Sequence, residues 1–361
     1  MALYVSRKLR HYRWLCNAIS PTYLPQGSTL SIPESDNDWP EIIYLASIHG
    51  MLPCLFVRLK TNQLLEHLPQ DVSEALEGFY ELNCLFNIQL RDQIIATTRL
   101  LNAQGIKPIW LKGAGNLLAS DWESSSRTML DLDLWIPEPN EQLRAIKILI
   151  SDGYFIQPDS VGADYGSCQH YAPIIKPGQP ARLEIHRHIV SPFCSPLLRD
   201  EVAVKKIVWR EQENYSFGTL SPDDQIMQSY LQCTEQGIDC FNPRNTVRLM
   251  KIVDFLERFV SSELVETWFT QHTLLDGNPW KLKARQFGSH LSQYFLLEHL
   301  GPVDKPYLRK ITFALNFPKL EAIGHIIGHG SYLLRHGKLG PLNAWPGKLY
   351  RQILTLKNNH S

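Results

Sequence analysis

Apolar residues recur every three or four positions over most of the first hundred residues. The clearest stretch is 69–105, where a glycine ends the pattern and seven apolar side chains follow this spacing: Leu76, Phe79, Leu82, Phe86, Leu90, Ile94 and Leu101. This is the period of an α-helix with one buried face. The segment 38–61 opens with Asp38 and Pro40, two residue types that favour the start of a helix. The pattern predicts a helical N-terminal region over residues 1–104.

After Gly105 the pattern changes to short apolar runs that alternate with helical segments. Runs at 106–113 and 129–137 predict strands, 114–122 and 140–154 predict helices, and 170–178 and 181–190 predict two strands joined by the Pro-Gly-Gln-Pro turn at 177–180. Strands that alternate with helices and end in a hairpin predict a small mixed sheet of about four to five strands.

The helical period returns from about residue 195. Segments 221–237, 245–260, 261–272 and 281–301 each carry it. The predicted fold is therefore α+β, with a small mixed sheet and its helices in residues 105–194, between helical regions at 1–104 and 195–361.

The composition indicates which classes of partner the protein can bind and in which compartment it is found. The 36 basic residues balance the 36 acidic ones, so we expect no strong general nucleic-acid patch. No run approaches the 18 to 20 apolar residues of a membrane span, so we expect no membrane partner. The seven cysteines are scattered without a Cys-x-x-Cys pair, which favours a reducing compartment and predicts a cytoplasmic protein.

Two aspartates stand two positions apart inside the apolar run at 129–137. On a strand, Asp131 and Asp133 would share one face, while Leu130, Leu132 and Leu134 would fill the other. Burying two unpaired like charges costs several kcal/mol, and a divalent cation removes that cost. Mg²⁺ prefers a few carboxylate oxygens together with substrate phosphates, so the pair predicts a metal site.

The strand predicted at 181–190 supplies a third carboxylate. Glu184, His186 and His188 alternate on one face, and Glu184 is the candidate that completes the metal site. The same strand also permits an alternative, a zinc site formed by His186 and His188 with His170.

Lys112 and Gly113 provide a place for phosphate. They stand where a predicted strand runs into a predicted helix, and the free N–H groups and positive dipole end of a helix N-terminus favour anions.

Taken in order, these motifs resemble the uncharacterised nucleotidyltransferase family of the polymerase-β-like superfamily. That family has an apolar strand ending in Lys-Gly, a short helix, an Arg-x-Met-x-Asp-apolar-Asp-apolar run, a helix closing in Gly-Tyr and a later acidic-apolar-His strand. The matching residues are Lys112-Gly113, the run from Arg127 to Leu134, Gly153-Tyr154 and Glu184-Ile185-His186. The resemblance covers about residues 105–190.

The resemblance implies a nucleotidyltransferase that uses Mg²⁺ or Mn²⁺ and a nucleoside triphosphate (NTP). Asp131, Asp133 and Glu184 would be the catalytic and metal-binding residues. An acceptor hydroxyl would attack the α-phosphorus in line and expel pyrophosphate. The acceptor is left open as a protein side chain, a small molecule or an RNA end.

The resemblance also implies which other residues face the nucleotide. Lys112, Gly113, Arg127 and His186 would contact it, and the serine-rich loop that ends at Arg127 would lie on the approach of the triphosphate. Asp254 either lines the same cleft or carries a surface charge.

Two alternatives remain at the level of sequence. Ala114 follows Gly113 where the superfamily commonly has Gly or Ser, and Glu184 stands where the family commonly has Asp. These departures favour a module with the same fold that binds a ligand without turnover. A phosphotransferase on the same scaffold is the other alternative.

Overall fold

The structure is a computed structural model of the 361-residue chain. It describes residues 7–22, 24, 30–33, 35–118, 126–161, 165–166, 168–236, 249–273, 281–297, 300 and 304–316. The serine-rich loop before Arg127, expected on the triphosphate approach, lies mostly outside these residues.

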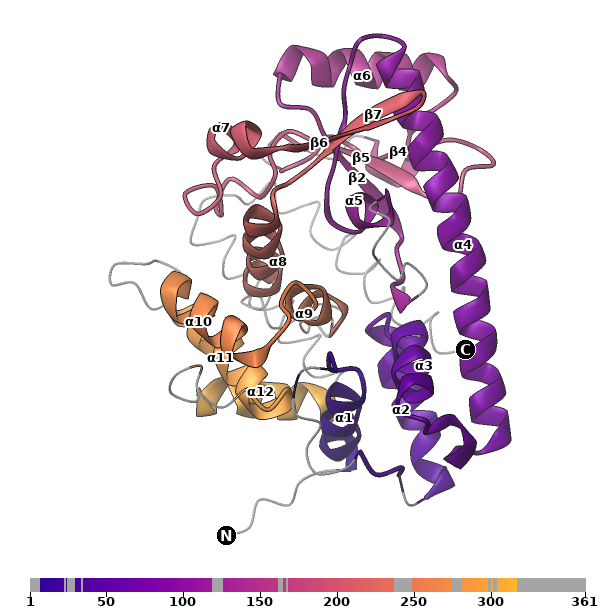
Figure 1. The fold of residues 1–361 in the computed structure, drawn as a ribbon, viewed down its shortest axis with the longest axis vertical. Coiled ribbons are helices and arrows are strands. Elements are labelled where there is room, and N and C mark those ends of the chain that lie inside the picture. Colours follow the sequence, from indigo (N-terminus) through magenta and orange to yellow (C-terminus); the bar gives the residue numbers. More distant parts are fainter. Residues whose placement is uncertain are drawn as a thin grey trace, which may run out of the picture.

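An open mixed sheet forms one half of the molecule (Figure 1). Its seven strands within the described ranges are β1 (Ile109–Trp110), β2 (Asp131–Trp135), β3 (Phe155–Ile156), β4 (Ile174–Ile175), β5 (Arg182–His186), β6 (Val208–Gln212) and β7 (Tyr215–Thr219), in the order β3-β4-β5-β2-β1-β7-β6. The pairs β2–β5 and β1–β7 are parallel and the other four are antiparallel. The predicted α+β fold, with a mixed sheet and helices at both ends, is confirmed.

The sheet has more strands than the four to five that the sequence pattern predicted. Three strands were not predicted: β3 follows the helix predicted at 140–154, and β6 and β7 fall in the range 195–361, which was expected to be helical. β6 is an edge strand that pairs only with β7, and all five of its residues are exposed. Such a strand needs no alternation of apolar and polar residues, so its sequence carries no strand period.

Helices surround the sheet and fill the other half of the molecule. Those before the sheet are α1 (Arg7–Ala18), α2 (Trp39–Ile48), α3 (Leu52–Thr61) and α4 (Gln70–Asn102), and those within it are α5 (Lys112–Leu118) and α6 (Pro139–Ser151). Those after it are α7 (Asp200–Ala203), α8 (Pro222–Gln236), α9 (Leu249–Leu256), α10 (Ser262–Thr273), α11 (Lys281–Tyr294) and α12 (Lys305–Asn316). No helix in the described part is both long and apolar enough to cross a membrane.

Two hydrophobic cores determine which way the acidic residues face. Leu132, Leu134, Leu183 and Ile185 of the sheet pack with the C-terminal half of α4 and with α6 in one core. The other core joins α1, α2 and α3 to α8, α9, α11 and α12, and it includes Trp135 from the opposite face of β2. Asp133 shares that face with Trp135, so the acidic face of the sheet is directed toward the helical half.

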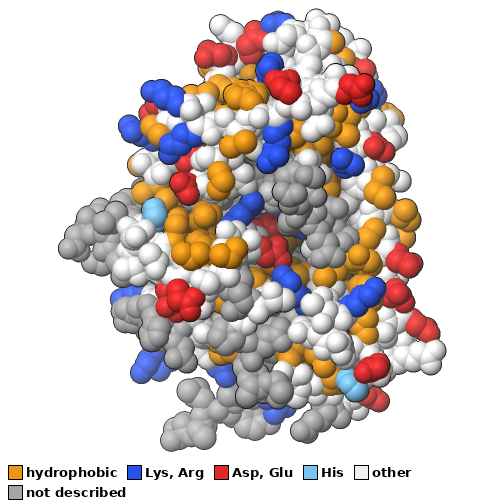
Figure 2. All heavy atoms as spheres, viewed as in Figure 1, with side chains coloured by type: hydrophobic (Ala, Val, Ile, Leu, Met, Phe, Trp, Pro, Cys, Tyr) orange, Lys and Arg blue, Asp and Glu red, His pale blue; other side chains and the backbone are white. Residues whose placement is uncertain are grey.

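The face of the molecule shown in Figure 2 carries both signs of charge. Basic and acidic side chains are interspersed on it, between areas of apolar ones, and a hollow lies near its centre. This distribution agrees with the balanced composition of the chain.

His290 of α11 lies in the helical core and gives the stability a pH dependence. It is 1% exposed, and its Nε2 lies 3.2 Å from the hydroxyl of Tyr12. Burial, helped by the nearby His49, lowers the pKa of His290 to about 3 from the ordinary 6.5. Below pH 6.5 the unfolded chain therefore binds a proton that the folded protein does not. The part of the stability that is linked to His290 is fully present above pH 6.5 and is lost as the pH falls toward 3.

We expect this histidine to lower the free energy of unfolding by about 2 kcal/mol between pH 7 and pH 5. Urea unfolding at both pH values measures the loss. His290→Gln is expected to lack this part of the pH dependence, whereas His67→Gln, which changes an exposed histidine, is expected to keep it. The same loss in His290→Gln as in the unmodified protein would contradict the assignment.

Candidate active site

The pairing of β2 with β5 brings two carboxylates together. The strands are parallel, and Asp133 stands opposite Glu184 in the register. Both side chains are buried, with Asp133 3% and Glu184 7% exposed. His186, also on β5, is fully buried, and one potential ligand atom from each of the three residues lies within 4.8 Å of the others.

Two side chains that can donate hydrogen bonds hold the carboxylate of Asp133. The ammonium of Lys112 and Nε2 of His186 each lie 2.7 Å from its Oδ1. Burial alone would raise the pKa of Asp133, but the charge of Lys112 and the contact with His186 outweigh it and hold the pKa well below its usual value. Asp133 is therefore a carboxylate at neutral pH.

The negative charge of Glu184 is less fully compensated by neighbouring cations. Nε of Arg182 lies 3.0 Å from its Oε1, an ionic contact without good hydrogen-bond alignment, and Nε2 of His170 lies 3.6 Å from its Oε2. Burial and then the negative charge of Asp133 raise the pKa of Glu184, and His170 opposes them. Two carboxylates this close favour a cation between them.

Asp131 lies on the same face but at the rim of the site. It is the first residue of β2, its side chain is 40% exposed, and its Oδ2 lies 3.3 Å from Arg182. The register explains this position, because Asp131 stands opposite Arg182 rather than opposite a carboxylate. Of the three predicted acids, the structure brings Asp133 and Glu184 together and leaves Asp131 beside a cation.

Arg182 was not anticipated from the sequence. It contacts both Asp131 and Glu184 from the strand that carries Glu184. Its position two residues before Glu184 places it on the same face of the strand, which is the one signal that the sequence contained.

His186 is better suited to orient Asp133 than to bind a metal directly. Its Nδ1 lies 3.1 Å from the carbonyl oxygen of His188 and its Nε2 faces Asp133, so both ring nitrogens meet oxygen acceptors. A cation on Nε2 would have to replace the contact with Asp133. The two carboxylates are the oxygen ligands that Mg²⁺ and Mn²⁺ prefer, and the residues present fit such an ion.

The alternative zinc site is not assembled. β5 ends at His186, and His188 turns away to place its Nδ1 2.7 Å from Asp200. Within the described ranges, the group of His, Cys, Asp and Glu that could hold a metal is Asp133, Glu184 and His186, without His170 or His188.

Lys112 and Gly113 begin α5, which a single residue separates from the end of β1. Lys112 has a φ of 51°, in the left-handed region that residues with a side chain seldom adopt. Gly113 is tightly enclosed, because a Cβ there would collide with the guanidinium of Arg127 and with Sδ of Met129. The local backbone thus directs the Lys112 ammonium onto Asp133 and lets Arg127 lie across the glycine.

Replacing Gly113 with alanine is expected to lower the free energy of unfolding by about 1–3 kcal/mol, because Sδ of Met129 and the guanidinium of Arg127, which Asp254 holds, must move. Urea unfolding measures the effect. Gly78→Ala is a matched control in the middle of α4, where a Cβ meets nothing within 4 Å, and alanine is expected to stabilise that helix by up to about 1 kcal/mol. Equal effects at both positions would contradict the enclosed geometry at Gly113.

Arg127 joins the sheet to the helices instead of pointing at open solvent. Its Nε lies 2.8 Å from Oδ1 of Asp254 on α9, and its NH2 nitrogen lies 2.7 Å from Oδ2. Its backbone oxygen accepts hydrogen bonds from Asn83 and Asn87 of α4. Asp254, which the sequence left between cleft and surface, is largely buried by this pair.

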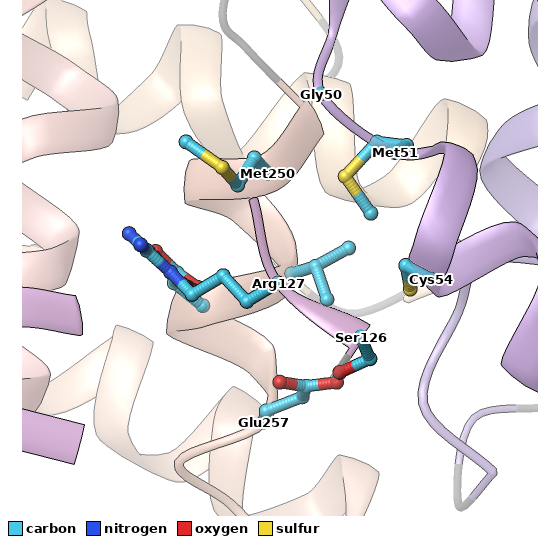
Figure 3. Close-up of a pocket in the computed structure, with 9 residues that line it drawn as sticks. Gly50, Met51, Cys54, Ser126, Arg127, Met250 and Glu257 are labelled. Carbon is cyan, nitrogen blue, oxygen red and sulfur yellow. Dashed lines mark hydrogen bonds and ion pairs between the residues drawn. The ribbon is translucent and has the colours of Figure 1, made fainter. Parts of the chain in front are cut away.

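A small cavity lies beside this ion pair (Figure 3). It holds about 230 Å³ of open space, part of it continuous with solvent. Met51 directly precedes α3 and Cys54 lies in its first turn. Met250 lies in α9, Glu257 directly follows it, and Ser126 precedes Arg127. The cavity therefore lies between the N-terminal and C-terminal helices, next to a residue predicted to contact the nucleotide.

Comparison with known proteins adds one finding to this geometry. Neither the curated proteins nor the solved structures include a significant match to the chain. The family model described as "Uncharacterised nucleotidyltransferase" matches residues 35–284, which is more than half of the 361 residues. The match includes the paired carboxylates of β2 and β5, the Lys112-Gly113 turn and the Arg127–Asp254 pair. The chain therefore belongs to the uncharacterised nucleotidyltransferase family.

Proposed function

We propose that the protein is an enzyme that transfers a nucleoside monophosphate from an NTP to an acceptor and releases pyrophosphate. The observation that carries the proposal is the parallel register that sets Asp133 against Glu184, beside Lys112, in a chain of this family. The cation is proposed to be Mg²⁺ or Mn²⁺, with Asp133 and Glu184 as its ligands. Asp131 is proposed as a third ligand that contributes from the rim once Arg182 moves aside.

Each remaining residue has a proposed task. A bound divalent ion would supply charge neutralisation at the triphosphate and a lower pKa for the acceptor hydroxyl. His186 holds the Asp133 carboxylate in place. Gly113 would let a phosphate approach the backbone once the side chains of Arg127 and Met129, which fill the space beside it, move aside. Lys112 and Arg127 offer positive charge to the triphosphate. The acceptor hydroxyl attacks the α-phosphorus, its bond to phosphorus forms as the bond to pyrophosphate breaks, and its proton leaves to solvent.

The proposal places the reaction in the cytoplasm and keeps three classes of acceptor: a protein side chain, a small molecule and an RNA end. The test is incubation of the purified protein with each α-labelled NTP, Mg²⁺ or Mn²⁺, and a cell lysate, scored for transferred label. We expect label from at least one NTP to reach an acceptor only when the divalent ion is present. Absence of transfer with every NTP, combined with a thermal stability that neither NTP nor metal changes, would refute the proposal.

One observation favours a second candidate, a module that binds a ligand without turnover. Lys112 and His186 already occupy Oδ1 of Asp133, and both contacts compete with a metal ion. For this candidate we expect nucleotide binding without transferred label. Phosphoryl transfer on the same scaffold is separated from both by product mass, because the acceptor gains one phosphate instead of a nucleotide.

A further inference from the structure

The ammonium of Lys112 lies inside the candidate metal site. It is 2.7 Å from Oδ1 of Asp133, whose side chain is only 4% exposed. A divalent ion bound to the Asp133 carboxylate would therefore lie close to a positive charge that is already present. Like charges at that separation repel strongly where water is largely excluded. Lys112 and a metal ion thus compete for the same carboxylate.

The position of Lys112 is built into the backbone. Its φ of 51° is a conformation that costs energy for any residue with a side chain, and it occurs at the turn between β1 and α5. The hydrogen bond from the amide of Leu111 to the carbonyl oxygen of Asp133, 3.0 Å long, fixes this turn against β2. The Lys112 side chain is 21% exposed, so it has a route out of the site that Asp133 lacks.

Lys112 also stands next to the proposed phosphate position. Gly113 follows it, and Arg127 lies across that glycine. A lysine that leaves Asp133 would find phosphate oxygens within the reach of its flexible side chain, and an ammonium is a strong donor to phosphate.

We propose that Lys112 is an exchangeable counter-ion that makes metal binding depend on the triphosphate. Without nucleotide it neutralises Asp133. When a metal–triphosphate complex binds, Lys112 leaves Asp133 and donates to phosphate oxygens, which frees the carboxylate for the metal ion. This inference rests on the proposed function, because it requires that the site binds a metal and an NTP.

The test measures binding and does not require turnover. Mn²⁺ affinity is determined by electron paramagnetic resonance, alone and with a non-hydrolysable NTP analogue, for the full chain and for Lys112→Met. In the unmodified protein we expect the analogue to tighten Mn²⁺ binding. In Lys112→Met we expect Mn²⁺ alone to bind at least about tenfold more tightly, because one positive charge is gone, and the analogue to bind at least about tenfold more weakly.

Two further variants are included, one as a control and one as a replacement for Lys112→Met. Lys107→Met removes an exposed lysine that pairs with Glu211 near the start of β1, and we expect it to change neither affinity. Lys112→Gln keeps a donor for Asp133 and replaces Lys112→Met if that variant does not unfold cooperatively. The measurements on the unmodified protein test the proposal without any variant.

Opposite changes in the two affinities are the signature of the exchange. A lysine that only stabilises the fold would not tighten Mn²⁺ binding when it is removed. Equal Mn²⁺ affinity with and without the analogue in the unmodified protein would overturn the inference, as would unchanged or weaker binding of Mn²⁺ alone by a folded Lys112 variant. A chain that binds neither Mn²⁺ nor the analogue would instead refute the proposed function itself.

Discussion

Replacing Asp133 with asparagine is expected to lower nucleotidyl transfer by at least about 10³-fold. The amide has the same shape as the carboxylate but lacks the negative charge of the most buried carboxylate of the site. A catalytic metal ion contributes several kcal/mol to the transition state, and each 1.4 kcal/mol corresponds to about a tenfold rate. The rate of label transfer under saturating NTP and metal measures the loss, and Mn²⁺ binding is expected to weaken in parallel.

Asp152→Asn is the matched control for this prediction. Asp152 also forms an ion pair with a lysine, at 2.8 Å from Lys176, but its side chain is 40% exposed and lies outside the site. We expect this variant to transfer label at the unmodified rate. Transfer by folded Asp133→Asn at a rate near that of the unmodified protein would remove Asp133 from the chemistry.

Replacing Asp254 with alanine is expected to lower the free energy of unfolding by about 3–5 kcal/mol. The variant leaves the guanidinium of Arg127, 12% exposed, without the carboxylate that it contacts through two nitrogens. Burial opposes the charge of Arg127, and Asp254 outweighs burial and raises the pKa of the guanidinium. Removing one partner of a buried pair leaves an uncompensated buried charge, which destabilises the folded state strongly. Urea unfolding measures the change.

Two further variants distinguish the effect of losing the whole ion pair from the effect of losing one of its partners. Removing both partners in Arg127→Met/Asp254→Leu is expected to destabilise the protein less than Asp254→Ala does, because no uncompensated charge is left. Glu141→Ala, which breaks an exposed pair with Arg144, is expected to cost at most about 1 kcal/mol. A loss below about 1 kcal/mol in Asp254→Ala would show that Arg127 finds other partners.

The local parts of the site were predictable because they follow from strand geometry alone. The spacing of Asp131 and Asp133 placed them on one face of a strand, and the structure has them on the same face of β2. Glu184 was predicted on a second strand, and it lies opposite Asp133. The helix predicted over 69–105 corresponds to α4, although Phe79 and Leu82 of its expected buried face are exposed.

The pairings between distant residues were not predictable from these patterns. Whether Asp131 or Asp133 stands opposite Glu184 depends on the register of β2 and β5, and a shift of two residues would preserve every apolar face. Arg127 and Asp254 are 127 positions apart in the sequence, and the sequence around either residue does not indicate that the other is its partner. The edge strand β6 left no period because none of its side chains is buried.

The long helix α4 contributes side chains to both hydrophobic cores. At 33 residues it is about 50 Å long. Leu76, near its start, belongs to the core of the helical half, whereas Leu90, Ile94 and Leu101 belong to the core of the sheet. Unfolding either core would leave half of this helix without its apolar partners. We therefore expect the two halves of the molecule to unfold together as one cooperative unit.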